Sequence, residues 1–495
     1  SLATFMNVLD SSIANVSLPA IAGDLGVSPG QGTWVITSFG VANAISVPLT
    51  GWLTQRFGAV RLFTLSVLLF VLASWLCGFA PSLEMLVAFR VMQGLVAGPM
   101  IPLSQTLLLS SYPRAKAGTA LALWGMTTLV APVVGPLLGG WITDHISWPW
   151  IFYINVPVGL FAAALTWSVY HKRETPRRKL PIDGVGLVLL VLWVGAMQLM
   201  VDKGKELDWF ASGQIIALAV LAVVGLAFFV AWELTDKHPV VDLTLFFRRN
   251  FSFGVVSLSV AYGLFFGNVV LLPLWLQQYM GYTAISAGMA LAPVGILAIV
   301  LTPVVGRNVA RWDPRIMASG AFVVFGLVLW MRSQFTTQTD FTTILLPTLI
   351  QGAAMAFFFI PLTTLTLAGL PPERMPAAAG LSNFVRIMAG AVGTSIATTL
   401  WDSRAALHHA HLVERLQTGD PVAQEALGRM TAGGLSPEQA LAQLNRLIDQ
   451  QAMTRAADDI FYASSLLFVA MIALIWFTRR PPRAGGAAVD LGGAH

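Results

Sequence analysis

Charged residues are scarce in this sequence: they make up 11% of its 495 residues, whereas a soluble domain carries about 25%. Hydrophobic residues account for 56%. A soluble fold could not hide so much apolar surface from water, so the composition excludes a soluble domain and indicates an integral membrane protein.

Cysteine is almost absent as well. The one cysteine, Cys77, lies inside an apolar segment. An internal disulfide is therefore excluded, and the polar parts of the chain must be stable without one.

Patterns typical of catalysis or metal binding are missing. The polar segments show no Ser/His/Asp arrangement, no phosphate-binding loop and no metal-ligand cluster, which argues against an enzyme. The run "HHAH" at His408 to His411 lacks a completing Cys or carboxylate pattern, so we interpret it as a solvated helix face. We expect no cofactor and no metal site.

Long apolar stretches recur along nearly the whole chain. Each has about 20 residues, enough for a helix to cross roughly 30 Å of hydrocarbon, and each is bounded by polar residues or by Pro and Gly. The sequence therefore predicts an all-α integral membrane protein with fourteen transmembrane helices. The expected spans are 2–22, 33–52, 62–80, 84–110, 117–143, 149–170, 184–202, 213–233, 251–275, 284–305, 316–335, 342–368, 378–402 and 460–478.

Basic residues are unevenly distributed between alternate loops. Most of the 29 Lys and Arg residues fall on the side that includes 171–183 and 234–250. By the positive-inside rule this side is cytoplasmic, and both termini lie there. Topology then explains the net charge of +5, and no nucleic-acid partner is expected. The first span begins almost at residue 1 without an initiator Met, so the depth of Asp10 in the membrane stays open.

The two ends of the chain resemble each other. "PLTGWLTQR" at 48–56 and "PVVGRNVAR" at 303–311 agree at Pro, Gly and Arg, and "QG" followed by "IPL" occurs in both halves. This pattern indicates a six-plus-six parallel repeat, as in transporters whose two bundles rock about a central site. The expected organisation is an N-terminal six-helix bundle at 1–170, a cytoplasmic linker at 171–183, two additional helices at 184–233, a C-terminal six-helix bundle at 250–478 and a cytoplasmic tail at 479–495.

A long polar segment, 403–459, interrupts the C-terminal bundle on the periplasmic side. Ser436, Pro437 and Gln439 suit the start of a helix with a capping box, and an apolar stripe follows. Asp420 precedes a proline and suits the start of a shorter helix. An amphipathic surface outside the membrane needs a partner to cover it.

Asp10 places a carboxylate in the first apolar span. On a helical wheel, Asp10 and its polar neighbours fall within an arc of about 160°, opposite an apolar face. A polar stripe cannot face lipid, so this face must look into the bundle or into a water-filled cavity. Asp10 is therefore the candidate proton carrier. The alternative is a permanently paired structural acid, or one at the periplasmic boundary.

Arg90 in the fourth span is the candidate partner of Asp10. It shares a helix face with Gln93 and Gly94. Arginine stays charged at any relevant pH, so it cannot carry the proton but can modulate the pKa of a nearby proton site. The alternative is a structural anchor, and the two roles are compatible.

Further candidates are weaker, because each could equally serve helix packing. Polar, aromatic and Met side chains suit an adaptable substrate site, and the candidates are Asn15, Asn43, Gln93, Tyr262, Asn268, Met355, Phe358, Asn383 and Arg386. The stretch "APVVGPLLGG" is both bendable and able to dock closely, as a gate requires. Its candidates are Gly135, Pro136, Gly139 and Gly140.

These motifs carry a family resemblance over nearly the full length. The stretches "LDSSIANVSLP", "GWLTQRFG", "RVMQG", "GPLLGG" and "WPWIFYINVP" resemble those of the fourteen-helix drug:proton antiporters of the major facilitator superfamily, and most of all the EmrB-type multidrug efflux pumps. The resemblance implies a bacterial inner-membrane protein that exports hydrophobic drugs and is driven by the proton motive force. Asp10 and Arg90 occupy the positions of the family's membrane acid and motif arginine.

The resemblance also implies partners and a gate. The partners are a periplasmic membrane-fusion adaptor of the EmrA type, which could contact 403–459, and an outer-membrane channel of the TolC type. The gate is the loop pattern of Gly51, Gln55, Arg56, Gly58 and Arg61. The family carries an Asp before the basic residue, where this chain has Gln55. Hydrogen bonding by Gln55, helped by Arg61, is the expected weaker substitute for a charge relay.

Two other functions stay open at this point. A narrow exporter of a metabolite, a siderophore or a fatty acid would share the same architecture. A non-transporting receptor or scaffold that signals through 403–459 would leave the buried acid and the internal repeat without explanation.

Overall fold

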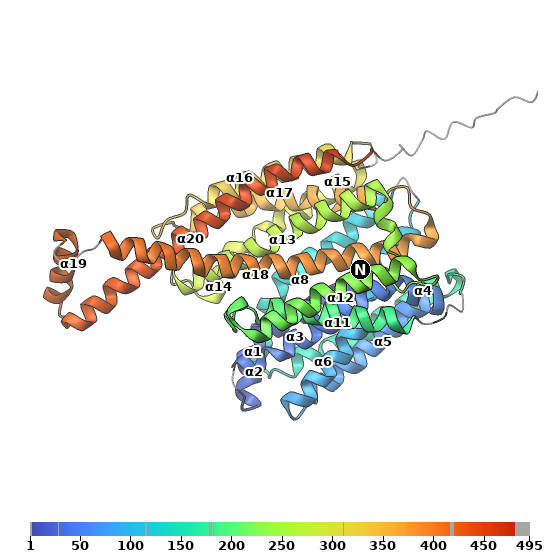
Figure 1. Cartoon of the computed structure of the whole chain (residues 1–495), viewed down its shortest axis with the longest axis horizontal. Helices are drawn as coiled ribbons and strands as arrows, with labels where there is room; N and C mark the ends of the chain where they lie inside the picture. Colours follow the sequence, from blue (N-terminus) through green and yellow to red (C-terminus); the bar gives the residue numbers. More distant parts are fainter. Residues whose placement is uncertain are drawn as a thin grey trace, which may run out of the picture.

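The computed structural model describes residues 2–27, 29–113, 116–177, 181, 183–309, 311–415 and 420–480, and this part of the chain folds into helices without strands. The helices form an elongated bundle, and two of them project from one end with a short helix at their tip (Figure 1). The expected all-α class is confirmed.

The first half of the bundle precedes the linker. It contains α1 (Leu2–Asp24), α2 (Pro29–Gly32), α3 (Trp34–Ser46), η1 (Val47–Leu49), α4 (Thr50–Phe57), α5 (Ala59–Gly78), α6 (Leu83–Ala97), α7 (Met100–Ser110), α8 (Ala117–His145), α9 (Trp150–Tyr153) and α10 (Asn155–Tyr170). The linker begins with a short turn, η3 (His171–Arg173).

The inserted helices and the second half follow. They are α11 (Gly184–Lys203), η4 (Trp209–Ala211), α12 (Gly213–Thr235), η5 (Leu243–Phe247), α13 (Arg249–Gln278), α14 (Ala284–Leu291), α15 (Val294–Asn308), α16 (Pro314–Arg332), α17 (Phe341–Thr366), η6 (Pro372–Arg374), α18 (Met375–Arg415), α19 (Pro421–Ala432) and α20 (Pro437–Trp476).

The two halves repeat one packing scheme. In the first half α1 packs on α8, α3 on α6, and α5 on both α6 and α10; in the second half α13 packs on α18, α15 on α17, and α16 on both α17 and α20. The inserted helices α11 and α12 pack on each other, and α11 contacts α3 and α18. This repeated packing is compatible with the predicted division into two six-helix bundles and an inserted helix pair, which stays a prediction.

Twelve segments of the described part are long and apolar enough to cross a membrane. Helices α1 and α8 are not among the twelve, although they have 23 and 29 residues. Each is therefore long enough to span roughly 30 Å. The expected count of fourteen is compatible with the structure and stays a prediction.

Several expected spans are broken where a proline enters. The span 84–110 divides into α6 and α7 at Gly98 and Pro99, because proline lacks an N–H and clashes with the preceding turn. Gly98 also lets α3 approach, since a Cβ there would lie 2.6 Å from the Ser46 side chain. The expected span 284–305 divides in the same way before Val294.

The polar segment 403–459, called the extension below, is built differently from the expectation of a separate excursion. Helices α18 and α20 run on past the predicted span ends at 402 and 460 to form its two arms, with α19 at the tip (Figure 1). The predicted helix starts are confirmed: Asp420 caps α19, and Ser436 and Gln439 form a capping box at α20. The end of the bundle with the arms is called the extension end, and the opposite end the linker end.

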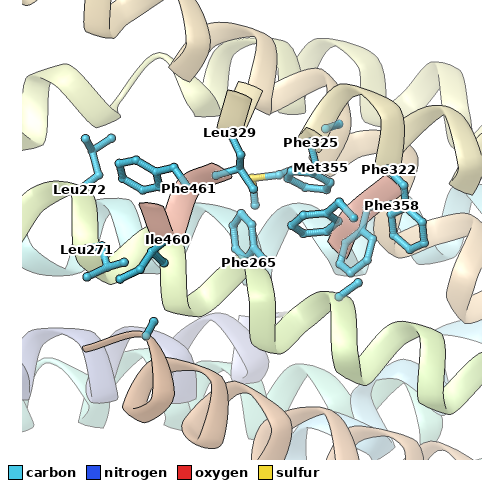
Figure 2. Packing of buried hydrophobic residues seen from close by; sticks show 14 of the residues in the cluster. Phe265, Leu271, Leu272, Phe322, Phe325, Leu329, Met355, Phe358, Ile460 and Phe461 are labelled. Atoms are coloured by element: carbon cyan, nitrogen blue, oxygen red, sulfur yellow. The ribbon is translucent and has the colours of Figure 1, made fainter. Parts of the chain in front are cut away.

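The second half is held by an aromatic core. Phe265 from α13, Phe322 and Phe325 from α16 and Phe358 from α17 pack in edge-to-face or tilted pairs within one buried cluster (Figure 2). Aromatic pairs of this geometry add about 0.5–1.5 kcal/mol each to the apolar burial. The cluster joins α13, α16 and α17 of the second half through buried aromatic contacts.

Candidate functional site

Asp10 lies inside the first half and accepts hydrogen bonds from three side chains, two on α6 and one on α10. Its Oδ2 accepts from Arg90 Nη1 at 2.6 Å, and its Oδ1 accepts from Asn155 Nδ2 at 2.7 Å and from Gln93 Nε2 at 3.1 Å. Asp10 is 2% exposed and Arg90 is fully buried. All three contacts are donated to the carboxyl group, so the geometry is that of an ionised, proton-free carboxylate.

Arg90 has other partners that do not depend on Asp10. Its Nε donates to the Val35 carbonyl at 2.9 Å, and its Nη1 also donates to Gln93 Oε1 at 2.6 Å. The guanidinium lies over the rings of Phe39 and Phe152, 4.3 and 5.6 Å from their centroids. These contacts can hold the cation in place when Asp10 is neutral.

Small residues bring these helices close enough for the network to form. A Cβ at Gly94 would lie 2.5 Å from the Phe39 carbonyl oxygen, so only glycine allows α6 to press against α3 here. Ser74 of α5 accepts from Gln93 Nε2 at 2.7 Å. Ser74 and Asn155 were not predicted as site residues, although Asn155 lies in one of the quoted motifs.

The Asp10 network lies toward the extension end of the first half. Val35 is the second residue of α3, Asn155 is the first residue of α10, and Ser74 lies near the end of α5. These helix ends face away from the linker. The predicted pairing of Asp10 with Arg90 is therefore present in the structure, and the proton-carrying role stays a prediction.

A second polar site lies between the two halves. A cavity of only about 10 Å³ is lined by residues of α7, α8, α13, α17 and α18. Gln105 from the first half accepts a hydrogen bond from Asn383 Nδ2 of the second half at 3.1 Å. A drug-sized molecule needs about 300–1,000 Å³, so the two halves must separate before this site can hold one.

Arg386 is the cation of this inter-half site. It is 6% exposed, and its Nη2 donates to Asn383 Oδ1 at 2.6 Å. The guanidinium lies 4.7 Å from the centroid of the Tyr262 ring and about 6 Å from those of Trp124 and Phe359. Within the described part of the chain no carboxylate forms an ion pair with it. Trp124 was not predicted as a site residue.

The remaining candidates for substrate binding are dispersed. Met355 and Phe358 lie in the aromatic core of the second half and do not line the inter-half cavity (Figure 2). Asn268 donates to Ser464 of α20 at 3.0 Å. Asn15 is exposed, and Asn43 is half-buried with an Oδ1 that finds no hydrogen-bond donor. Their roles stay predictions.

Helix α1 connects the Asp10 network with the inter-half cavity. Thr4 Oγ1, on the same helix as Asp10, hydrogen-bonds Ser104 Oγ. Ser104 also accepts from Trp124 Nε1 at 3.0 Å, and Trp124 lines the cavity together with Gln105. A shift of α1 would therefore move Ser104 and, through it, the Trp124 side chain at the cavity wall.

At the linker end, glycines let the two halves touch backbone to backbone. A Cβ at Gly51 of α4 would lie 2.8 Å from Ala377 Cα of α18. A Cβ at Gly118 of α8 would lie 2.2 Å from the Gly306 carbonyl oxygen of α15. Gly51 and Gly306 hold equivalent places in the internal repeat, so the linker end is closed by two related crossings.

The loop between α4 and α5 carries the other predicted gate residues. Gly58 has φ of +89° and ends α4. Arg56 lies 5.4 Å from the centroid of the Trp52 ring, and Gln55 is half-buried. Their roles in gating stay predictions.

An acid from the linker occupies this same turn. Glu174 accepts from the backbone N–H groups of Val60 and Arg61, both at 3.0 Å, at the start of α5. Sequence reasoning expected Gln55 and Arg61 to substitute for a missing acid, but a carboxylate is present here from a residue far along the chain.

The gate stretch of α8 packs mainly on α1. A Cβ at Gly135 would lie 2.4 Å from Ser12 Oγ, and one at Gly139 would lie 2.9 Å from Ile13 Cγ2. A Cβ at Gly140 would meet open space. Pro136 belongs to the same helix, and its side chain lies outside the described residues.

The histidine run lies on the arm formed by α18. His408 Nε2 is 2.8 Å from Asp459 Oδ2, and His409 Nε2 is 3.3 Å from Asp449 Oδ1, both on α20. Within the described part of the chain, no group of three or more Cys, His or carboxylate side chains could hold a metal ion. These pairs join the two arms of the extension.

Comparisons with known proteins agree with this architecture. The model of the Major Facilitator Superfamily matches residues 1–394. The chain is 51% identical to multidrug export protein EmrB of Escherichia coli K12, over 100% of this chain and 96% of that protein. It is 48% identical to fatty acid resistance protein FarB of Neisseria gonorrhoeae, over 98% and 96% of the two chains.

A solved structure supports the fold alone. The human organic anion transporter MFSD10 aligns with a TM-score of 0.59 at 13% identity, covering 96% of this chain and 98% of that one. The superfamily consists of membrane transporters and not of enzymes. The chain therefore belongs to the major facilitator superfamily, and within it to the family of EmrB-type exporters.

Proposed function

We propose that this protein is a proton-driven multidrug efflux antiporter that exports hydrophobic toxic compounds across the bacterial inner membrane, with both termini in the cytoplasm. The observation that carries the proposal is the buried Asp10–Arg90 pair. An ionisable pair inside a membrane bundle is costly and by default marks a functional site. The name of the relative EmrB, a multidrug export protein, supports the choice of substrate.

The mechanism follows from the partners of the pair. A proton from the periplasmic side neutralises Asp10 and releases Arg90 Nη1 from the carboxylate. Arg90 then remains on Gln93, on the Val35 carbonyl and between two rings. Freed from this anchor, α1 shifts and moves Ser104, which accepts a hydrogen bond from Trp124 at the cavity wall. Drug binding at the cavity and proton binding at Asp10 thus exclude each other.

The proton gradient supplies enough energy for useful export. One charge that crosses a potential of about 100 mV releases about 2.3 kcal/mol. At about 1.4 kcal/mol per tenfold change, this supports roughly a fifty-fold drug gradient before any pH difference is added.

We also propose that the pump works with a periplasmic adaptor of the EmrA type and an outer-membrane channel of the TolC type. The extension projects from the bundle (Figure 1). It presents apolar side chains outward, with Val422 70% and Leu441 56% exposed. Exposed apolar residues on a projecting element suit a protein contact.

Growth tests measure the breadth of export. In a bacterial strain without its own efflux pumps, expression of this protein should raise the inhibitory concentrations of several chemically unrelated hydrophobic toxicants. A multidrug pump relies on an adaptable apolar site, so protection should not follow one chemical class. Protection against a single compound class would contradict the multidrug proposal and favour a narrow exporter.

Fatty-acid export is the second candidate, and Arg386 favours it. A buried guanidinium that is surrounded by rings and lacks a carboxylate partner within the described chain can receive the head group of an amphiphilic anion. The relative FarB is named for fatty acid resistance. The same cavity could serve both substrate classes.

Replacing Arg386 by Gln should weaken the binding of laurate by about tenfold or more, because a charge-assisted hydrogen bond is lost. Binding of methyl laurate, which has the same chain but no charge, should change little. Calorimetry in detergent measures both, and Arg386→Lys is the control that keeps the positive charge. If Arg386→Gln weakens the binding of laurate and methyl laurate equally, Arg386 shapes the cavity and does not bind the carboxylate.

A further inference from the structure

Two buried acids meet at the linker end of the inserted helices, far from the Asp10 network in sequence. Asp183 is the residue before α11 and caps that helix, and Glu233 lies in the last turn of α12. Asp183 is 8% and Glu233 2% exposed. Neither residue takes part in the mechanism above.

The two carboxyl groups converge over Gly186. A Cβ built on this glycine would lie 2.1 Å from Asp183 Oδ2 and 2.5 Å from Glu233 Oε1. The two oxygens are therefore close neighbours across the face of α11 that glycine leaves open. Glu233 Oε1 is fully buried and has no hydrogen-bond partner.

The other oxygens of the pair are already satisfied by donors. Asp183 Oδ1 accepts from the Gly186 N–H at 2.8 Å, and the Trp232 indole N–H lies 3.0 Å from both Asp183 oxygens. Glu233 Oε2 accepts from the Val241 N–H at 3.0 Å. Asp183 thus has the contacts of an ionised carboxylate, and Glu233 Oε1 is the atom without a partner.

Among the described residues, the charged groups that act on Glu233 are acidic. Asp183 from α11 and Asp236 beyond the end of α12 both act on Glu233. In the segment that leads to α13, Asp242 is bound to Arg374. Within the described part of the chain no Lys or Arg forms an ion pair with Asp183 or Glu233. Two ionised carboxylates that meet beside Gly186 in a buried, water-excluded site would repel each other strongly.

We propose that Asp183 and Glu233 hold one proton between them and form a proton-binding site at the linker end of the inserted helices, separate from Asp10. The proton resides on Glu233 Oε1 and is donated to Asp183 Oδ2. This single hydrogen bond satisfies the orphan oxygen and removes one of the two charges. A metal ion fits poorly, because the Trp232 and Gly186 N–H groups already point at the Asp183 oxygens.

The site joins three parts of the chain. Asp183 ends the linker from the first half, Glu233 ends the inserted pair, and Val241 belongs to the segment that leads into the second half. Loss of the proton at alkaline pH would drive the two carboxylates apart and loosen this junction. The packing of the inserted helices would then depend on the pH on the linker side of the membrane.

Thermal unfolding of the full chain in detergent tests the proposal. Above about pH 4.3 an unfolded Glu has lost its proton, whereas the folded pair keeps one. The folded state then binds more protons, so its stability must fall as pH rises. Glu233→Gln stays neutral and keeps the shape. Its midpoint should match the wild type near pH 5 and exceed it by about 2 °C near pH 8.5.

Three controls make the result decisive. Asp183→Asn keeps an acceptor for the helix cap and should show the same gain at high pH, and the double variant should gain no more than either single variant. Glu373→Gln, an exposed Glu on η6, should show no gain. Infrared spectra of the wild type near pH 7 should contain a protonated carboxylic acid band that Glu233→Gln lacks.

One outcome would overturn the proposal. If Glu233→Gln is less stable than the wild type across the whole pH range and the infrared band is unchanged, both acids are ionised and neutralised by a cation. The measurement reports stability and not export, so its result is independent of the proposed transport function.

Discussion

The Asp10→Asn variant is expected to bind drug and to lose proton-driven export, with a fall of at least about 100-fold in the rate of drug accumulation by inverted vesicles. The single oxygen of asparagine can still accept from Asn155 and Gln93, so these two contacts are kept and the contact with Arg90 is lost. It cannot gain or lose a proton, so the exchange between proton and drug has no carrier.

Stability must be separated from coupling in this experiment. Removing one partner of a buried ion pair costs about 3–5 kcal/mol, because the other charge is left unpaired. The double variant Asp10→Asn/Arg90→Gln removes both charges and should recover much of this stability without recovering export. A variant that is folded by unfolding midpoint and still exports at the wild-type rate would contradict the assignment.

Closure of the linker end is expected to fail in Gly118→Ala. Its methyl group would lie 2.2 Å from the Gly306 carbonyl oxygen, and a backbone atom cannot move aside as a flexible side chain can. Helices α8 and α15 would be held apart, so the state seen here could not form. Export should fall about tenfold or more, and cysteines placed at the linker end should react faster with a water-soluble maleimide.

Gly320→Ala on α16 is the matched control. A Cβ at Gly320 meets no atom within 4 Å, so this change should leave export and labelling at wild-type levels. If Gly118→Ala also exported normally, the close crossing of α8 and α15 would not be required for transport.

Much of the fold was predictable because the membrane leaves few choices. Apolar stretches of helix length must become helices in lipid, and the repeated Pro, Gly and Arg positions indicated two related bundles. The breaks inside spans were not predicted. Proline is common in membrane helices, and whether it ends a helix, as at Pro99, or is absorbed, as at Pro303 inside α15, depends on the neighbouring helix.

The acid and its cation were predictable, and most of the remaining site was not. A carboxylate on a polar helix face has to turn inward and find a cation, which pointed to Asp10 and Arg90. Asn155 and Ser74 complete the network through contacts between distant segments that no helical wheel contains. Phe358, predicted as a drug-site residue, lies in the aromatic core. A ring that suits a drug site suits such a core equally well, and its role in drug binding stays a prediction.

The acid at the loop between α4 and α5 comes from the linker, which the sequence analysis did not predict. Glu174 lies far along the sequence from Gln55, yet its carboxylate caps the start of α5 beside Gly58. The sequence of the loop between α4 and α5, taken alone, indicated that the acid found in the family is missing here. Only the fold shows that an acid is provided by another segment.

Proton release on drug binding tests the central claim most directly. Purified protein in weakly buffered detergent solution, with a pH dye, is mixed with a hydrophobic drug at each of several starting pH values. The wild type should release protons as drug binds, and Asp10→Asn should bind the drug and release none. Equal proton release from both proteins would show that Asp10 is a structural acid and that the proton is carried elsewhere.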